Sequence, residues 1–144
     1  MAGRAAHRSG VETRELAAAK SLRGAVGAVL NLRTAFIMLT SPSHTPSQVA
    51  VATCDVAAAV ARWNRHYGEL GQIVGADHPD LRAVQLPYWM LLANCNRACD
   101  DADPGRSVSR LRPPPSVREV NEALEMWNAR YETLRTLVLR CAAS

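Results

Sequence analysis

Apolar side chains recur at alternating steps of three and four residues along four long segments of this 144-residue chain. Near the C-terminus, for example, Leu124, Trp127, Tyr131 and Leu134 follow this spacing. Side chains three and four residues apart lie on one face of an α-helix, and no segment shows the strict alternation of a half-buried strand. The pattern therefore predicts an all-α protein whose helices each bury one apolar seam.

Residues typical of helix ends mark the boundaries of these segments. Thr45 followed by Pro46 is a typical helix start, and Ser116 with Glu119 three residues later forms a capping box. Asp77 is placed to cap a third helix, just after Gly75 ends the second. These signals predict four helices, at residues 14–39, 46–74, 79–99 and 117–142.

The lengths of the connections determine how these helices can be arranged. The first two connections are short, so consecutive helices must run antiparallel. We therefore expect a single-domain, antiparallel up-down four-helix bundle over residues 14–142. A flexible N-terminal tail is expected over residues 1–13, and a linker rich in proline and arginine over residues 103–115.

One motif occurs twice. The pattern W-N-x-x-Y-x-x-L begins at Trp63 in the second predicted helix and again at Trp127 in the fourth, 64 positions later. The first and third helices show no comparable match. The repeat suggests that the bundle arose by duplication of a helical hairpin, and the match covers only one of the two helices in each hairpin.

Most of the aromatic residues are expected to lie at one level of the bundle, where Pro87 should kink the third helix because it removes a backbone donor. Large rings against the small residues of the first helix would make a well-packed core, which is the interpretation we favour. The alternative is a small-molecule pocket with aromatic walls and polar flanks. Its candidate lining residues are Trp63, Tyr67, Tyr88, Trp89, Trp127, Tyr131, His66 and Arg130.

The first and third predicted helices are poor in charge. The third has no charged residue between Arg82 and Arg97, and the first has Arg33 alone after Arg23. A helix that is apolar on most sides needs more burial than one bundle face provides. We expect a protein partner or a second copy to cover these helices, with the linker as the alternative cover. The candidate interface residues are Val29, Leu30, Phe36, Ile37, Leu86, Trp89 and Met90.

The net charge of +4 permits binding to an acidic partner without requiring one. The arginines are scattered, and the two densest groups lie in the N-terminal tail and in the linker. Neither group is interleaved with stacking aromatic residues, so a nucleic-acid-associated role is a third hypothesis.

The sequence contains no catalytic motif, so we expect neither catalytic residues nor a cofactor. Cys54, Cys95 and Cys99 should lie near His44 at one end of the bundle, a set that could bind zinc. However, Cys-x3-Cys is not a zinc-knuckle spacing, so buried thiols are expected instead of a metal site. The apparent lack of a signal peptide or a transmembrane run predicts a cytoplasmic or other reducing intracellular location.

Overall fold

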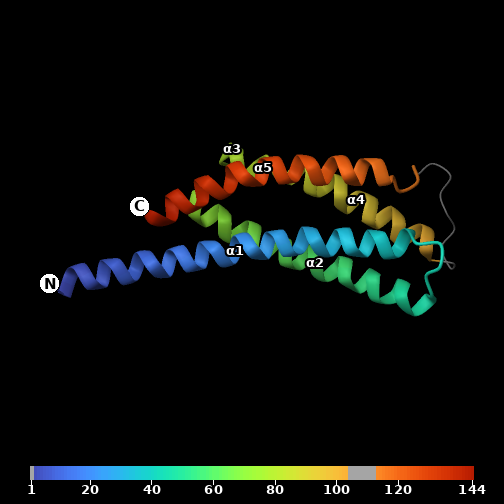
Figure 1. The fold of residues 1–144 in the computed structure, drawn as a ribbon, viewed down its shortest axis with the longest axis horizontal. Coiled ribbons are helices and arrows are strands. Elements are labelled where there is room, and N and C mark those ends of the chain that lie inside the picture. Colours follow the sequence, from blue (N-terminus) through green and yellow to red (C-terminus); the bar gives the residue numbers. More distant parts are fainter. Residues whose placement is uncertain (1, 104–112) are drawn as a thin grey trace.

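The computed structural model describes residues 2–103 and 113–144, and within them the side chains of all but residues 2–9. Every regular element in these ranges is an α-helix, and four long helices pack together (Figure 1). The prediction of an all-α protein is confirmed. The elements are α1 (Ala2–Thr40), α2 (Pro46–Val74), the one-turn α3 (Pro79–Arg82), α4 (Gln85–Ala102) and α5 (Val117–Ala143).

Helix α1 is the element against which the other long helices assemble. It packs along α2 and also contacts α4 and α5, whereas α2 meets α4 and α5 over a much smaller surface. Figure 1 shows the α1–α2 loop, the end of α4 and the start of α5 at one end of the molecule, with both chain termini at the other. Many of the residues that α1 buries are small, which lets its neighbours approach closely. They include Ala18, Ala25, Ala28 and Ala35.

Helix α1 begins at Ala2, well before the predicted start at residue 14. Half of residues 2–13 are alanine, arginine or glutamate, which favour helix, and the two glycines, Gly3 and Gly10, cost about 1 kcal/mol each. Just after these residues, Nη2 of Arg14 donates a hydrogen bond to the backbone oxygen of Ser144 over 3.2 Å. The flexibility of residues 1–13 stays a prediction.

Both ends of α2 were predicted correctly. The Thr45 hydroxyl accepts a hydrogen bond from the Gln48 backbone, and the Gln48 side chain accepts one from the Thr45 backbone, at 3.2 and 2.8 Å. This is a complete capping box. At the other end Gly75 has a φ of 103°, a backbone conformation that favours glycine, and its N–H donates to the Gly71 carbonyl.

The third predicted helix is interrupted instead of kinked. Helix α3 ends at Arg82 and α4 starts at Gln85, so that Pro87 lies in the first turn of α4, where a missing N–H has little cost. The cap is also one residue later than predicted, because His78 and not Asp77 accepts the hydrogen bond from the Asp80 backbone.

The start of α5 is held by α4. Ser116 caps α5 as predicted, with its hydroxyl accepting from the Glu119 backbone at 3.1 Å. Its own N–H, however, donates to Oδ1 of the buried Asn94 at 2.9 Å, and the Glu119 carboxylate accepts from Asn94 and Arg97. The capping box is therefore shared between two helices. The predicted linker falls mostly on residues outside the described ranges.

Candidate functional site

Five aromatic side chains from three helices form one cluster in the core. Trp63 of α2 stacks on Tyr88 of α4 with ring centroids 4.1 Å apart, and it meets Trp127 of α5 edge-on at 6.3 Å. Each tryptophan also stacks on the tyrosine one helical turn later, Tyr67 or Tyr131. We call these five residues the aromatic cluster. It connects α2 to α4 and α5, with which α2 otherwise has little contact.

Trp89 does not belong to this cluster, contrary to the sequence-based expectation. Its side chain is 54% exposed, whereas the adjacent Tyr88 is 2% exposed. Neighbouring residues on an α-helix project about 100° apart, so the two rings cannot both face the core. The spacing of Val84, Tyr88, Leu91 and Cys95 puts Tyr88 on the apolar seam of the helix, and Trp89 shares only its level along the bundle.

The cluster is largely apolar, but it buries two polar atoms. The hydroxyl of Tyr88 and the indole N–H of Trp127 have no hydrogen-bond partner among the described residues. Burial, with a smaller contribution from Cys95, raises the pKa of Tyr88 to about 12, because the low-dielectric core disfavours a phenolate. The face-to-face contact of Trp63 with Tyr88 leaves no space for a ligand between those rings.

His66 is buried against a glycine of α1. A Cβ atom placed on Gly24 would lie 2.1 Å from the imidazole ring, so this close approach requires glycine. The His66 ring is held from both sides: Nδ1 lies 2.7 Å from the carboxylate of Glu69, and Nε2 accepts a hydrogen bond from Arg65 at 3.2 Å. These contacts place His66 in the α1–α2 packing.

Arg130 completes the break between α3 and α4. Its Nη1 donates to the carbonyl oxygen of Ala83 over 3.0 Å. Pro87 has no N–H to offer that carbonyl, so an arginine from α5 supplies the missing hydrogen bond. Both predicted polar flanks of the aromatic pocket, His66 and Arg130, therefore have packing or hydrogen-bonding roles in the fold. The sequence shows Pro87, which removes the hydrogen bond, but it does not show that Arg130 lies close enough to replace it.

The cysteines do not come together into a metal site. No group of three or more His, Cys, Asp or Glu side chains within residues 10–103 and 113–144 could hold a metal ion. Cys54 is exposed, whereas Cys95 is fully buried and its Sγ donates to the Leu32 carbonyl at 3.3 Å. Burial, with a smaller contribution from Cys99, raises the pKa of Cys95 to about 12.

This contrast predicts how the thiols react. N-ethylmaleimide should modify Cys54 of the native protein at pH 8 while Cys95 stays unmodified, because a thiol of pKa about 12 is only about 0.01% thiolate at that pH. Peptide mass spectrometry after timed quenching measures the two rates, with denatured protein as the control in which both react. Equal rates in the native protein would contradict this account of Cys95.

The predicted interface residues separate into two groups. Leu30 and Ile37 of α1, and Leu86 and Trp89 of α4, are each at least half exposed, and Met90 is half-buried against the core. Val29 and Phe36, by contrast, are 3% exposed and belong to the core, which corrects the prediction for them. The two core residues are the immediate sequence neighbours of Leu30 and Ile37, so one face of α1 is core and the next is surface. The arginines of the two basic groups lie mostly outside the described side chains.

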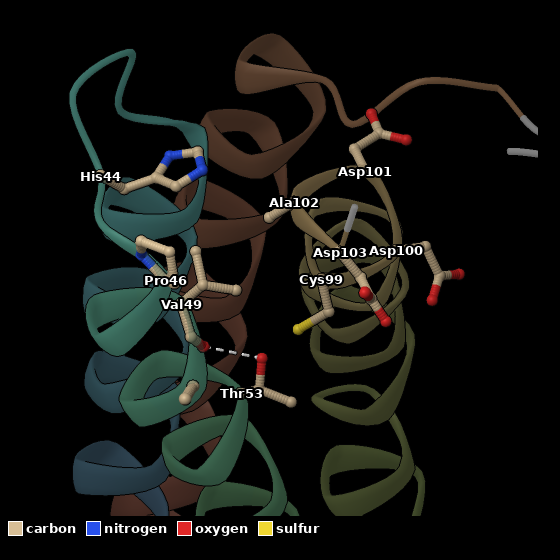
Figure 2. A pocket seen from close by; sticks show the side chains of 10 residues that line it. His44, Pro46, Val49, Thr53, Cys99, Asp100, Asp101, Ala102 and Asp103 are labelled. Atoms are coloured by element: carbon tan, nitrogen blue, oxygen red, sulfur yellow. Dashed lines mark hydrogen bonds between the residues drawn. The ribbon is translucent and has the colours of Figure 1, made fainter. Parts of the chain in front are cut away.

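A groove between α2 and α4 was not predicted. Near the α1–α2 loop it has a volume of about 760 Å³, and Figure 2 shows Val49 and Thr53 of α2 on one side of it, with the sulfur of Cys99 pointing in from α4. A second hollow of about 640 Å³ extends it along the helices to Val60 and Leu92. Thr53, Cys99 and Asp100 line both hollows, so the groove is continuous. The sequence signal for it was the absence of charge along one face of α2.

Helix α1 is long and apolar enough over Gly10–Thr40 to cross a membrane, judged by length and composition alone. Half of the most apolar window of this helix is buried inside the bundle, and both a core helix and a signal sequence near the N-terminus pass the same test. No protein-family model matches the chain, and comparisons with curated protein sequences and with solved structures find no match either.

Proposed function

We propose that this chain is a non-enzymatic helical-bundle protein that acts by binding another protein, as an assembly subunit or an adaptor. The observation that carries the proposal is on α4, where Leu86 and Trp89 are more than half exposed on a helix with no charged residue from Gln85 to Asn96. Exposed apolar patches of this kind mark interaction surfaces, and tryptophan is enriched among residues that dominate binding energy.

The proposal includes an up-down bundle derived from a duplicated hairpin. Support comes from the equal burial of equivalent positions in the repeat: Trp63 and Trp127 are both 3% exposed, and Leu70 and Leu134 are both 1% exposed. Each tryptophan also stacks on its own helix's tyrosine. Two hairpins that inherited one seam would bury it in this way.

A reducing intracellular location, where the exposed thiol of Cys54 would persist, remains part of the same proposal.

A second candidate function is the binding of a small molecule at the aromatic cluster. It is favoured by two buried polar atoms, Tyr88 Oη and Trp127 Nε1, that have no hydrogen-bond partner in the part of the chain that the structure describes. Such groups usually have a partner in a folded protein. A ligand library that leaves the tryptophan fluorescence unchanged would contradict this candidate.

The main proposal is tested by removing apolar surface from α4. Purified protein should self-associate in sedimentation velocity, or should co-purify with specific proteins from its source cells. Leu86→Gln combined with Trp89→Gln should abolish that association, because it removes both exposed side chains. Val51→Gln is the matched control, since Val51 is 61% exposed but lies on the charged side of α2. A monomer whose co-purifying proteins are the same in both variants would contradict the proposal.

A further inference from the structure

We infer that the groove between α2 and α4 binds an amphipathic helix of a partner protein, and that this helix carries basic side chains where it passes the end of α4. The inference names a partner class and a site, and it rests on the proposed function in protein binding. It is carried by three observations: the faces of α2, the uncharged wall of α4 and the acidity at one end of the groove.

Helix α2 has three faces instead of two. The core face includes Ala59, Trp63 and Leu70. The charged face carries Asp55, Arg62 and Glu69, spaced by seven residues and therefore aligned along the helix. A surface helix with one neighbouring core needs only these two faces.

The third face of α2 is uncharged and lines the groove. It consists of Pro46, Val49, Ala50, Thr53, Ala57 and Val60. Ala50, Thr53 and Ala57 are exposed in this structure. Small side chains in such a row allow another helix to approach closely, and a face devoid of charge gains little from facing water.

The opposite wall of the groove is uncharged as far as Cys99. Leu92, Asn96 and Cys99 of α4 line it, and Asp100 follows at its end. The exposed Trp89 lies seven residues before Asn96 and therefore on the same side of α4, two turns along. Trp89, which supports the proposed function, thus lies on the same side of α4 as the groove, beyond its last lining residue Leu92.

The dimensions of the groove suit a helix. Its α2 wall from Pro46 to Val60 is about 22 Å long at 1.5 Å per residue. Both walls are helices, so there is no free strand edge on which an extended peptide could pair. Burying an apolar stripe between two helices is the common way in which a helix binds a groove.

The charge at one end of the groove indicates the charge of the partner helix there. The end of α4 carries Asp100, Asp101 and Asp103 and no basic residue in its last turn, so the carboxylates add to the negative end of the helix dipole. Asp100 and Asp103 have interactions within the chain, but the exposed Asp101 and the helix terminus keep this end of the groove acidic. A basic end of the partner helix is complementary to it.

The test uses a synthetic peptide of about 18 residues, long enough to span the groove. The peptide is an amphipathic helix with a leucine and alanine stripe and lysines towards one end, and its counterpart has glutamates at the lysine positions. The full-length chain carries Cys54→Ser and Cys141→Ser, which leaves Cys99 in the groove and the buried Cys95. The readout is the rate at which N-ethylmaleimide modifies Cys99.

We expect the lysine peptide to slow modification of Cys99 by about tenfold at saturation and the glutamate peptide to leave it unchanged. Ala57→Arg should abolish the protection, because it adds bulk and positive charge to the groove wall. Ala58→Arg is the matched control: it adds the same residue one position away, outside the groove lining, and should retain the protection. Asp101→Lys should weaken it.

Two results would overturn the inference. One is equal protection by both peptides, or by neither. The other is self-association of the unmodified chain that Ala57→Arg abolishes, which would assign the groove to a second copy. If the peptide does not bind while Leu86→Gln with Trp89→Gln still removes the partner proteins, the groove inference fails and the proposed function stands.

Discussion

Replacing Trp63 by alanine is expected to lower the free energy of unfolding by about 3–5 kcal/mol, because it removes a buried indole and leaves a cavity. The loss includes ring contacts that connect helices, since Trp63 stacks on Tyr88 of α4 and meets Trp127 of α5. Aromatic pairs contribute about 0.5–1.5 kcal/mol each beyond the area they bury. Urea unfolding followed by circular dichroism measures the change.

The same substitution at Trp89 is the control. Trp89 is 54% exposed and lies outside the aromatic cluster, so Trp89→Ala should change the stability by about 0.5 kcal/mol or less. It should also remove the tryptophan that is most accessible to acrylamide quenching. Similar losses of stability at the two positions would contradict the assignment of Trp63 to the core and Trp89 to the surface.

Replacing Gly24 by alanine is expected to destabilise the protein, whereas the same change at Gly27 is not. The new methyl group at Gly24 would overlap the ring of His66, which is buried and held by Glu69, and such overpacking costs about 1–3 kcal/mol. At Gly27 the methyl group would meet the guanidinium of Arg62, which is exposed and can move into solvent. Gly27→Ala should therefore show the gain of up to about 1 kcal/mol that alanine gives in a helix.

A double-mutant cycle identifies the cause of the loss at Gly24. If the clash with the imidazole is responsible, Gly24→Ala should cost less in a His66→Ala background than in the unmodified chain. Thermal unfolding of the four variants supplies the comparison. Equal costs in the two backgrounds, or equal effects at Gly24 and Gly27, would show that the α1–α2 contact does not depend on glycine at this position.

Part of the candidate site was predictable because helical periodicity is local. The repeat placed Trp63 and Trp127 on equivalent seams of two helices, and their rings do meet. The spacing of Val84, Tyr88, Leu91 and Cys95 likewise places Tyr88 on the buried seam of its helix, whereas Trp89 lies off this seam and is exposed. The low charge of α1 pointed to an interface at Val29 and Phe36, but charge content does not show which face of a helix is buried, and both residues lie in the core.

The sequence by itself determined the helical character of the chain, the caps of α2 and the starts of α2 and α5. These features depend on residues within one helical turn of each other, so the chain specifies them before it packs. Only the tertiary structure decided the break before Gln85, where Arg130 supplies a hydrogen bond from 47 residues away. The groove between α2 and α4 likewise depends on how far apart two helices lie, a distance set by their shared packing on α1 and absent from any local pattern.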